Sequence, residues 1–179
     1  MRRFFLTALL ALAIGSAATP AIAQSAPASR PVAVSTVGPW EVVLWGKGRH
    51  VSRCTLVRTD VPAGQASYGL LVDHDGALFS VETNAWSLPN FPVDAVVTPA
   101  PGAARTLIAR PVSPHRANID VTLNPDLLTH LQLTERATVR IGEVMVWLAF
   151  DDFNAARMVL EACVQKIGTV VTARSGQSR

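Results

Sequence analysis

Two cysteines, Cys54 and Cys163, are the side chains with the clearest chemistry in this chain of 179 residues. Their separation is far from the C-x-x-C spacing of redox motifs, and no local signature connects either of them to a histidine. Two cysteines in an oxidising compartment have one possible intramolecular connectivity, so we expect a Cys54–Cys163 disulfide. A pair of free, buried cysteines is the alternative.

Asp73, His74 and Asp75 form the one cluster that resembles a site, because a carboxylate beside an imidazole can orient the ring or share a metal ion. The Asp75-Gly76 pair is also a tight-turn signal, and consecutive turn residues point in different directions. We therefore interpret the cluster as a solvated turn and expect no metal site. The chain has no H-E-x-x-H, paired C-x-x-C or G-x-S-x-G motif, so we predict no catalytic residue and no cofactor.

The four tryptophans could form a stacking platform for sugars or peptides. Trp40 and Trp147 fall at strand positions that are consistent with burial. Trp86 lies in an irregular stretch between Thr83 and Pro92, which makes it the best candidate for an exposed aromatic side chain. We therefore single out Trp86 as a possible contact with a ligand or partner, although core packing is the favoured interpretation even for this residue.

The segments that must position these residues are mostly short strands separated by turn residues. Turns at residues 74–76, 99–102 and 142–143 predict three hairpins. The expected fold class is mainly β, an antiparallel sandwich or barrel-like sheet with a short helix and a C-terminal helix packed on it. The strands are expected at residues 40–45, 51–59, 68–72, 77–83, 93–98, 104–110, 119–123, 137–141 and 144–148.

Two helices are expected in the last third of the chain. Asn124 followed by Pro125 predicts the start of the first, since asparagine is a good N-cap and proline suits the first turn. This helix should end near residue 133 and turn inward Leu127, Leu128 and Leu131. The second should begin at Asp151 or Asp152 and reach about residue 167, with Gly168 as its stop. Its apolar face, at helical spacing, is formed by Phe153, Ala156, Leu160, Cys163 and Ile167.

The first residues of the chain have the pattern of a secretory signal peptide. Arg2 and Arg3 precede an apolar run over residues 4–14, and Ala21-Ile22-Ala23 forms an A-x-A cleavage site. The run is shorter than the roughly 20 residues that cross a bilayer, so we expect no transmembrane anchor. We expect cleavage near Ala23 and a periplasmic or secreted protein of a Gram-negative bacterium. Twin-arginine export is an alternative to Sec export.

Composition suggests one domain and argues against nucleic-acid binding. Loss of Arg2 and Arg3 with the signal lowers the formal net charge from +3 to +1, and the remaining arginines are spread along the chain rather than clustered. We assign residues 1–23 to the signal peptide and 24–36 to a flexible leader that is rich in Ala, Ser, Pro and Val. Residues 37–171 form a single β-rich domain, and 172–179 a disordered tail.

The outline of the domain resembles the invasion-associated locus B family of small exported proteobacterial proteins and its uncharacterised relatives. The resemblance is carried by Trp40-Glu41-Val42-Val43, Cys54-Thr55-Leu56, Trp86-Ser87-Leu88 and the helix that ends at Cys163. It implies export, a β-rich fold and a disulfide between the two ends of the domain, with no established enzymatic site to transfer. Better-known members carry a further cysteine pair, which this chain lacks between Cys54 and Cys163.

Three function hypotheses follow. The first is a non-enzymatic periplasmic protein that binds an envelope protein or another envelope component through its sheet face or the Trp86 loop. The second is a small-molecule binding module with a pocket between sheet and helices. The third is a hydrolase that uses His74 or His50. The sequence does not indicate an oligomeric state.

Overall fold

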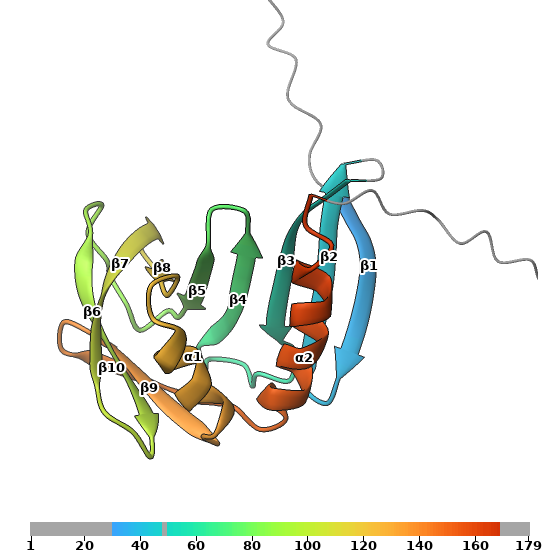
Figure 1. Ribbon diagram of the computed structural model, residues 1–179. Coiled ribbons are helices and arrows are strands. Elements are labelled where there is room, and N and C mark those ends of the chain that lie inside the picture. The colour runs from blue at the N-terminus through green and yellow to red at the C-terminus, as the bar shows by residue number, and fades with distance from the viewer. Residues whose placement is uncertain (1–29, 48–49, 169–179) are drawn as a thin grey trace, which may run out of the picture.

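The computed structural model describes residues 30–47 and 50–168 and consists of one antiparallel sheet and two helices (Figure 1). The sheet order is β1-β2-β3-β4-β5-β8-β7-β6-β9-β10. The predicted class, mainly antiparallel β with a short and a C-terminal helix, is confirmed. The elements are β1 (Arg30–Val37), β2 (Trp40–Lys47), β3 (His50–Arg58), β4 (Ser67–Asp73), β5 (Ala77–Glu82), β6 (Val93–Ala100), β7 (Arg105–Ser113), β8 (Arg116–Asp120), α1 (Pro125–Gln132), β9 (Arg136–Ile141), β10 (Val144–Ala149) and α2 (Phe153–Val164).

The ten strands form one continuous, strongly curled sheet, which is consistent with the expected sandwich or barrel-like arrangement (Figure 1). All named strand pairs are antiparallel, and the three predicted hairpins are β4–β5, β6–β7 and β9–β10. Gly76, in the first of these turns, has φ +144°, and a Cβ there would lie 2.2 Å from Thr122 Oγ1. Glycine is therefore required at this position, both by its backbone angle and by the close approach of the segment that carries Thr122.

The first strand is a correction to the sequence analysis, which assigned residues 24–36 to a flexible leader. Residues 30–37 form β1 and pair with β2, so residues 30–36 belong to the folded domain rather than to a flexible leader. The side chains of β1 are almost all exposed, so no hydrophobic alternation marks the strand in the sequence. Residues 1–29, which include the predicted signal peptide, and residues 169–179, which include the predicted tail, lie outside the described residues.

The core fills the inside of the curl and is organised around aromatic rings. Ring centroids of Trp40, Tyr68, Phe79, Phe150 and Phe153 lie 5.0–6.5 Å apart in a chain of mostly edge-to-face and tilted contacts. Contacts of this geometry stabilise a core beyond the burial of area alone. Four of the five rings come from β2, β4, β5 and the start of α2, so they join segments that are distant in the sequence.

Trp147 lies outside this core, contrary to the sequence interpretation. Its side chain is 62% exposed, whereas Val146 and Leu148 on either side of it are buried. Successive side chains of a strand point to opposite faces of the sheet, so Trp147 lies on the outer face of β10. The expectation that Trp40 is buried is confirmed.

The C-terminal helix α2 packs on β2 and β3 and is joined to the sheet by the predicted disulfide (Figure 1). Cys54 of β3 and Cys163 of α2 have Cα atoms 6.1 Å apart and are separated by 109 residues of sequence. Cys163 faces the core, as the helical spacing predicts. The helix ends at Val164, earlier than expected, because residues 165–168 leave it to place Ile167 beside Val51 in an isolated bridge.

Neither helix has the side-chain cap that the sequence suggests. Asn124 and Asp152 stand at the two N-cap positions, but neither side chain makes a capping hydrogen bond, and Asp152 has φ +57°. Within residues 30–47 and 50–168, neither helix has the length and apolar character needed to cross a bilayer.

Replacing Cys54 and Cys163 together by alanine is expected to lower the free energy of unfolding by about 2–5 kcal/mol, since the unfolded chain regains the entropy of an open loop. Urea unfolding of the double variant measures the loss. The wild type under reducing conditions should show a similar loss, and blocking of thiols after unfolding should detect none in the unreduced protein. An unchanged midpoint for the double variant would contradict the expectation.

Candidate functional site

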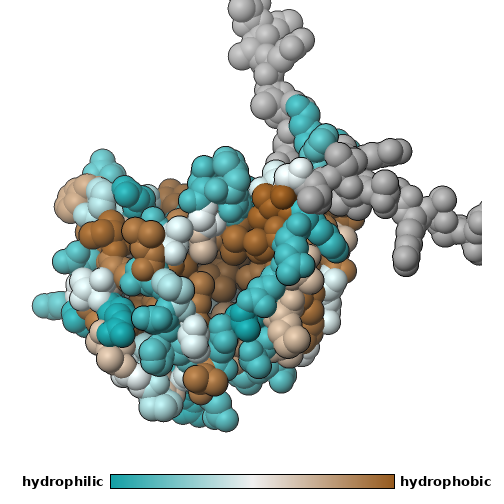
Figure 2. Space-filling model, in the orientation of Figure 1, coloured by the Kyte–Doolittle hydropathy of each residue, from teal (hydrophilic) through white to brown (hydrophobic). Residues whose placement is uncertain are grey.

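A cleft with a volume of about 490 Å³ lies between the two helices and the sheet. In the space-filling view the surface is hollowed at this place and its floor is apolar (Figure 2). The sheet supplies Leu70, Val72 and Ala77. The helices supply the remaining lining residues, which are Pro125, Leu128, Thr129, Gln132, Phe153, Arg157, Leu160, Glu161, Val164 and Gln165.

The cleft exists because the helices cover separate parts of the sheet. α2 packs on β2 and β3, while α1 is anchored by the buried side chains of Leu127 and Leu131. The strip of β4 and β5 between them is left without a helix over it. Leu128, which the sequence places on the inward face of α1, is only half-buried because it borders this opening.

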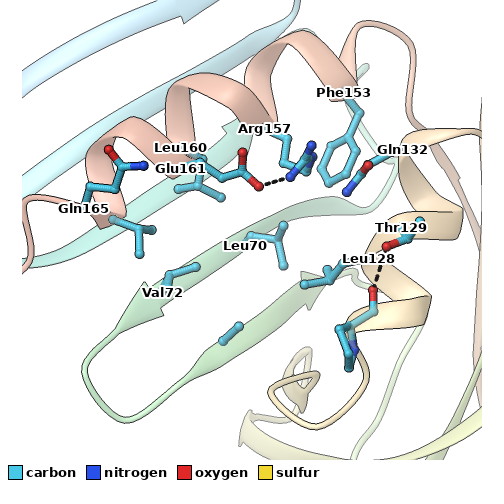
Figure 3. Close-up of a pocket in the computed structure, with 13 residues that line it drawn as sticks. Leu70, Val72, Leu128, Thr129, Gln132, Phe153, Arg157, Leu160, Glu161 and Gln165 are labelled. Carbon is cyan, nitrogen blue, oxygen red and sulfur yellow. Dashed lines mark hydrogen bonds and ion pairs between the residues drawn. The ribbon is translucent and has the colours of Figure 1, made fainter.

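The polar groups of the cleft come from the helices. Arg157 and Glu161, one turn apart on α2, form an ion pair, and their side chains are 26% and 54% exposed (Figure 3). Gln132 of α1 and Gln165 of α2 add two amides to the lining. Thr129 is already satisfied, since its hydroxyl donates to the Pro125 carbonyl (3.1 Å). The cleft is thus an apolar trough whose only charged groups are one cation and one anion that neutralise each other.

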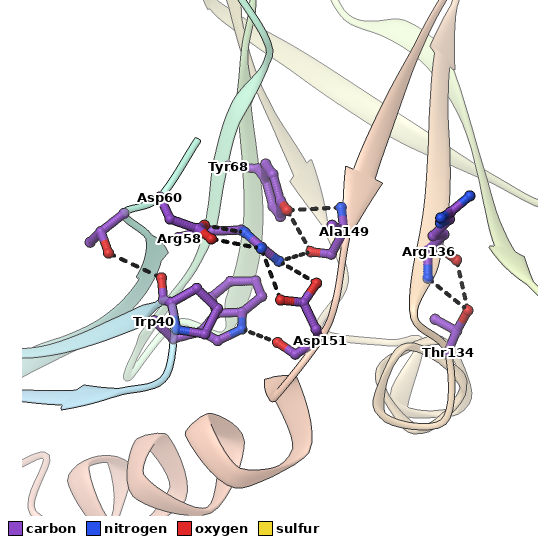
Figure 4. Close-up of polar contacts among 10 residues, drawn as sticks. Trp40, Arg58, Asp60, Tyr68, Thr134, Arg136, Ala149 and Asp151 are labelled. Atoms are coloured by element: carbon purple, nitrogen blue, oxygen red, sulfur yellow. Dashed lines mark hydrogen bonds and ion pairs between the residues drawn. The ribbon is translucent and has the colours of Figure 1, made fainter. Parts of the chain in front are cut away.

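A second polar cluster, centred on Arg58, joins the end of β10 to β2, β3 and β4 (Figure 4). The Arg58 guanidinium donates to the Ala149 carbonyl (3.0 Å) and to both carboxylate oxygens of Asp151 (2.9 Å each). It also pairs with Asp60. The Trp40 indole donates to the Asp151 carbonyl (2.7 Å), and the Ala149 amide donates to the Tyr68 hydroxyl (2.9 Å). This cluster closes the curl of the sheet.

The electrostatics of the Arg58 cluster fit a structural role. Burial would lower the pKa of Arg58, but its hydrogen bonds to Asp151 and Asp60 outweigh burial and raise it. The hydrogen bond from Arg58 lowers the pKa of Asp151, while burial raises the pKa of Tyr68 against the opposing charge of Arg58. Each group is held in its ordinary charge state at neutral pH, so none of the three is tuned for proton transfer.

Trp86 packs in the core, which is the favoured interpretation of the sequence, and its possible role as an exposed contact is therefore wrong. Its side chain is 2% exposed and belongs to the hydrophobic core. The loop that carries it is fastened to the β7–β8 turn: the Leu88 amide donates to the Pro114 carbonyl (2.8 Å), and His115 Nδ1 donates to the Trp86 carbonyl (2.7 Å). The loop is irregular in backbone but packed, and this packing buries the tryptophan.

The histidine and aspartate cluster lies at the turn that the sequence predicts, but its side chains converge instead of pointing apart: one ligand atom each of Asp73, His74 and Asp75 lies within 4.8 Å of the other two. Asp73 Oδ1 accepts the amide of Asp75 (2.9 Å), and the side chains of His74 and Asp75 both project into solvent. His50 lies exposed at the start of β3, and the Ser52 hydroxyl donates to the Trp45 carbonyl (3.2 Å). In residues 30–47 and 50–168 no serine or cysteine side chain is hydrogen-bonded to a histidine ring, so the hydrolase hypothesis finds no nucleophile–base pair there.

Sequence analysis did not identify Arg157 and Glu161. The signal available was an Arg and a Glu at i and i+4 beside the apolar face of α2, a spacing that brings the two side chains together. Such pairs are common on helix surfaces, and the pattern alone does not say that a second helix will lie opposite. Only the tertiary arrangement places α1 across the trough from this pair.

No protein-family model, no curated protein and no solved structure matches this chain. The resemblance to the invasion-associated locus B family therefore stays a prediction. Function has to be argued from the two polar clusters and the surfaces around them.

The Asp151→Asn variant is expected to lose less stability than the wild type when the pH is lowered. Because the folded-state pKa of Asp151 lies below its ordinary value of 3.8, the Arg58–Asp151 contact stabilises the fold above that pH and is lost as the pH falls through the folded pKa. The variant should be less stable than the wild type at neutral pH and lose less on acidification. Urea midpoints measured from neutral pH to about pH 2 test this.

The control for this series is Asp120→Asn. The hydrogen bonds from Thr122 also lower the pKa of Asp120, but Asp120 lies away from the Arg58 cluster. The stability of this variant should therefore still fall in acid by the amount that the Arg58–Asp151 contact contributes. Parallel profiles for Asp151→Asn and the wild type would show that the contact with Arg58 does not stabilise the fold.

Proposed function

We propose that this protein is a binding protein that takes up a small, largely apolar molecule in the cleft between α1 and α2. The observation that carries the proposal is a concave trough of about 490 Å³ with an apolar floor and a few polar groups at its rim. Ligand sites have this composition, and their volumes fall in the range of about 300–1,000 Å³. A trough of this kind can bind by burying apolar surface and needs no catalytic group.

The walls of the cleft are held in place without a ligand. Phe153 and Leu160 are buried at the base of α2, and the Cys54–Cys163 disulfide fixes its far end. A preformed site loses little conformational entropy on binding, which favours affinity. The disulfide is also consistent with export, and we propose the periplasm or the cell exterior as the place where the protein acts.

Filling the cleft should abolish binding. Leu128→Trp places a large ring in the opening, whereas Leu133→Trp adds the same ring at a position that is 81% exposed and does not line the cleft. With the apolar fluorophore N-phenyl-1-naphthylamine as probe, the wild type and Leu133→Trp should show saturable binding. Leu128→Trp should bind at least about tenfold more weakly, a loss of about 1.4 kcal/mol.

Thermal unfolding of both variants without probe is the control for folding. Absence of saturable binding to the wild type, or equal binding to Leu128→Trp and Leu133→Trp, would contradict the proposal.

A second candidate function is binding of an envelope protein at the free edge of β10. β10 is the last strand of the sheet, and its exposed side chains include Met145 and Trp147. The Phe150 amide donates to the carbonyl of Glu135, the residue before β9, so its backbone faces β9. The Ala149 amide donates to the Tyr68 hydroxyl instead, so its backbone faces away from β9. By the alternation of an antiparallel ladder, the backbone groups of Met145 and Trp147 face the free edge.

The two edge strands of the sheet, β1 and β10, differ in how well they are protected from pairing with a strand of another protein. β1, the other edge, carries Pro31 and an irregularity in its pairing between Pro31 and Ala33, which are features that discourage edge-to-edge pairing. Residues 144–149, with the sequence VMVWLA, contain neither charge nor proline. The partner that such an edge would accept is an extended, apolar segment of another protein that adds a strand to the sheet.

In-cell cross-linking of a tagged copy, followed by purification from envelope extracts, tests the second candidate. Trp147→Ser should lose a discrete cross-linked partner, because it removes the exposed ring beside the edge. Met158→Ser, at a position on α2 that is equally exposed at 63%, should retain it. Recovery of monomer alone, or of the same partner with Trp147→Ser, would contradict it.

A further inference from the structure

The charged groups of the cleft lining are a pair of opposite sign, and the two members are not equivalent. Arg157 is the more enclosed member, at 26% exposed, and its Nε atom is buried without a hydrogen-bond partner. Glu161 is 54% exposed and reaches the guanidinium from one helical turn further along α2 (Figure 3). Among residues 30–47 and 50–168, no other charged residue lines the cleft.

The contact between the two residues is easily exchanged. A solvent-accessible ion pair at i and i+4 on a helix contributes little to stability. If Glu161 rotates into water, its carboxylate keeps its hydration. If Arg157 were deprived of its carboxylate while enclosed by a ligand, an uncompensated cation would be left in a poorly hydrated place, which is costly. The group that can leave is therefore the glutamate, and the group that must stay paired is the arginine.

We infer that the cleft binds a linear apolar chain that ends in a carboxylate, such as a fatty acid. This inference rests on the proposed function and adds the chemical class of the ligand. The ligand carboxylate takes the position beside Arg157 that Glu161 occupies in the empty cleft, and Glu161 turns outward to solvent. The hydrocarbon chain lies on the apolar floor formed by Leu70, Val72 and Leu160.

The charge distribution selects the carboxylate over other head groups. An ammonium group would have to pair with Glu161 and leave Arg157 without an anion. A hydroxyl group could not replace the charge of Glu161, so it would bind beside the intact ion pair and gain only neutral hydrogen bonds, which are weaker than charge-assisted ones. The guanidinium, by contrast, presents planar paired donors that match a carboxylate.

Calorimetry with three probes of equal chain length tests the inference on the full folded protein: dodecanoate, dodecanol and dodecylamine, each below its aggregation concentration. The wild type should bind dodecanoate about tenfold or more tightly than dodecanol, as expected for one added charge-assisted hydrogen bond. Arg157→Gln should bind dodecanoate and dodecanol alike.

Glu161→Gln is the matched variant, because it changes the other member of the pair by the same chemistry. It removes the competing carboxylate, so it should retain or increase the preference for dodecanoate. Thermal unfolding of both variants checks that they fold.

The outcomes separate this inference from the proposal on which it rests. Similar affinities for all three probes, or a dodecanoate preference that survives Arg157→Gln, would overturn the inference and leave the apolar binding function intact. Tighter binding of dodecylamine, or of dodecyl phosphate as a fourth probe, would show that the head group class is wrong. Failure of every probe to bind the wild type would overturn both.

Discussion

The attachment of the end of β10 to the far side of the sheet is the contact on which the rest of the structure depends. Curling brings Ala149 beside β3 and β4, where no backbone ladder forms, and the Tyr68 hydroxyl accepts from the Ala149 amide in place of a strand partner. Arg58 enters the same junction largely buried, so it requires compensation, which Asp60 and Asp151 provide. Removal of Arg58 would leave Asp60 and Asp151 without their shared cation, whereas removal of either aspartate would leave the enclosed guanidinium with one carboxylate instead of two.

The same junction determines where α2 begins. Asp151 bonds Arg58 through its side chain and Trp40 through its carbonyl, and the helix starts two residues later. The opposite end of α2 is fixed to β3 by the disulfide. A helix fixed at both ends cannot tilt to cover the strip of sheet beside it, so the trough between α1 and α2 stays open. The cleft is thus a consequence of how the contacts of Asp151 and the disulfide fix the two ends of α2.

Local signals in the sequence predicted the hairpins, the inward face of α2 and the disulfide, because turn residues and periodicity act over a few residues. They misplaced Trp147, and for Trp86 they left an exposed contact open beside the favoured core packing. Residues 144–149 contain no charged residue to mark which face of β10 is outward, so Trp147 looked buried. An exposed Trp86 stayed open because its loop lacks periodicity, and the backbone bonds that pack that loop come from the β7–β8 turn. β1 was missed because it is held by backbone pairing with exposed side chains. The cleft needs two helices brought together by the sheet, which no local pattern describes.

The ion pair at the rim of the apolar trough would separate the affinity of a binding protein from its selectivity. In the empty protein Arg157 is neutralised by Glu161, so the trough carries no unpaired charge. When a carboxylate replaces Glu161, a solvent-accessible ion pair is exchanged for an enclosed charge-assisted contact, and the difference between the two is what separates a carboxylate from a hydroxyl group by about tenfold. Affinity then comes from burial of the chain, at about 0.8 kcal/mol for each fully buried CH₂ group. Discrimination among head groups comes from the arginine, which only an anion can satisfy. The apolar floor would therefore determine how tightly a ligand binds. Arg157, the enclosed cation, would determine which head group the cleft accepts.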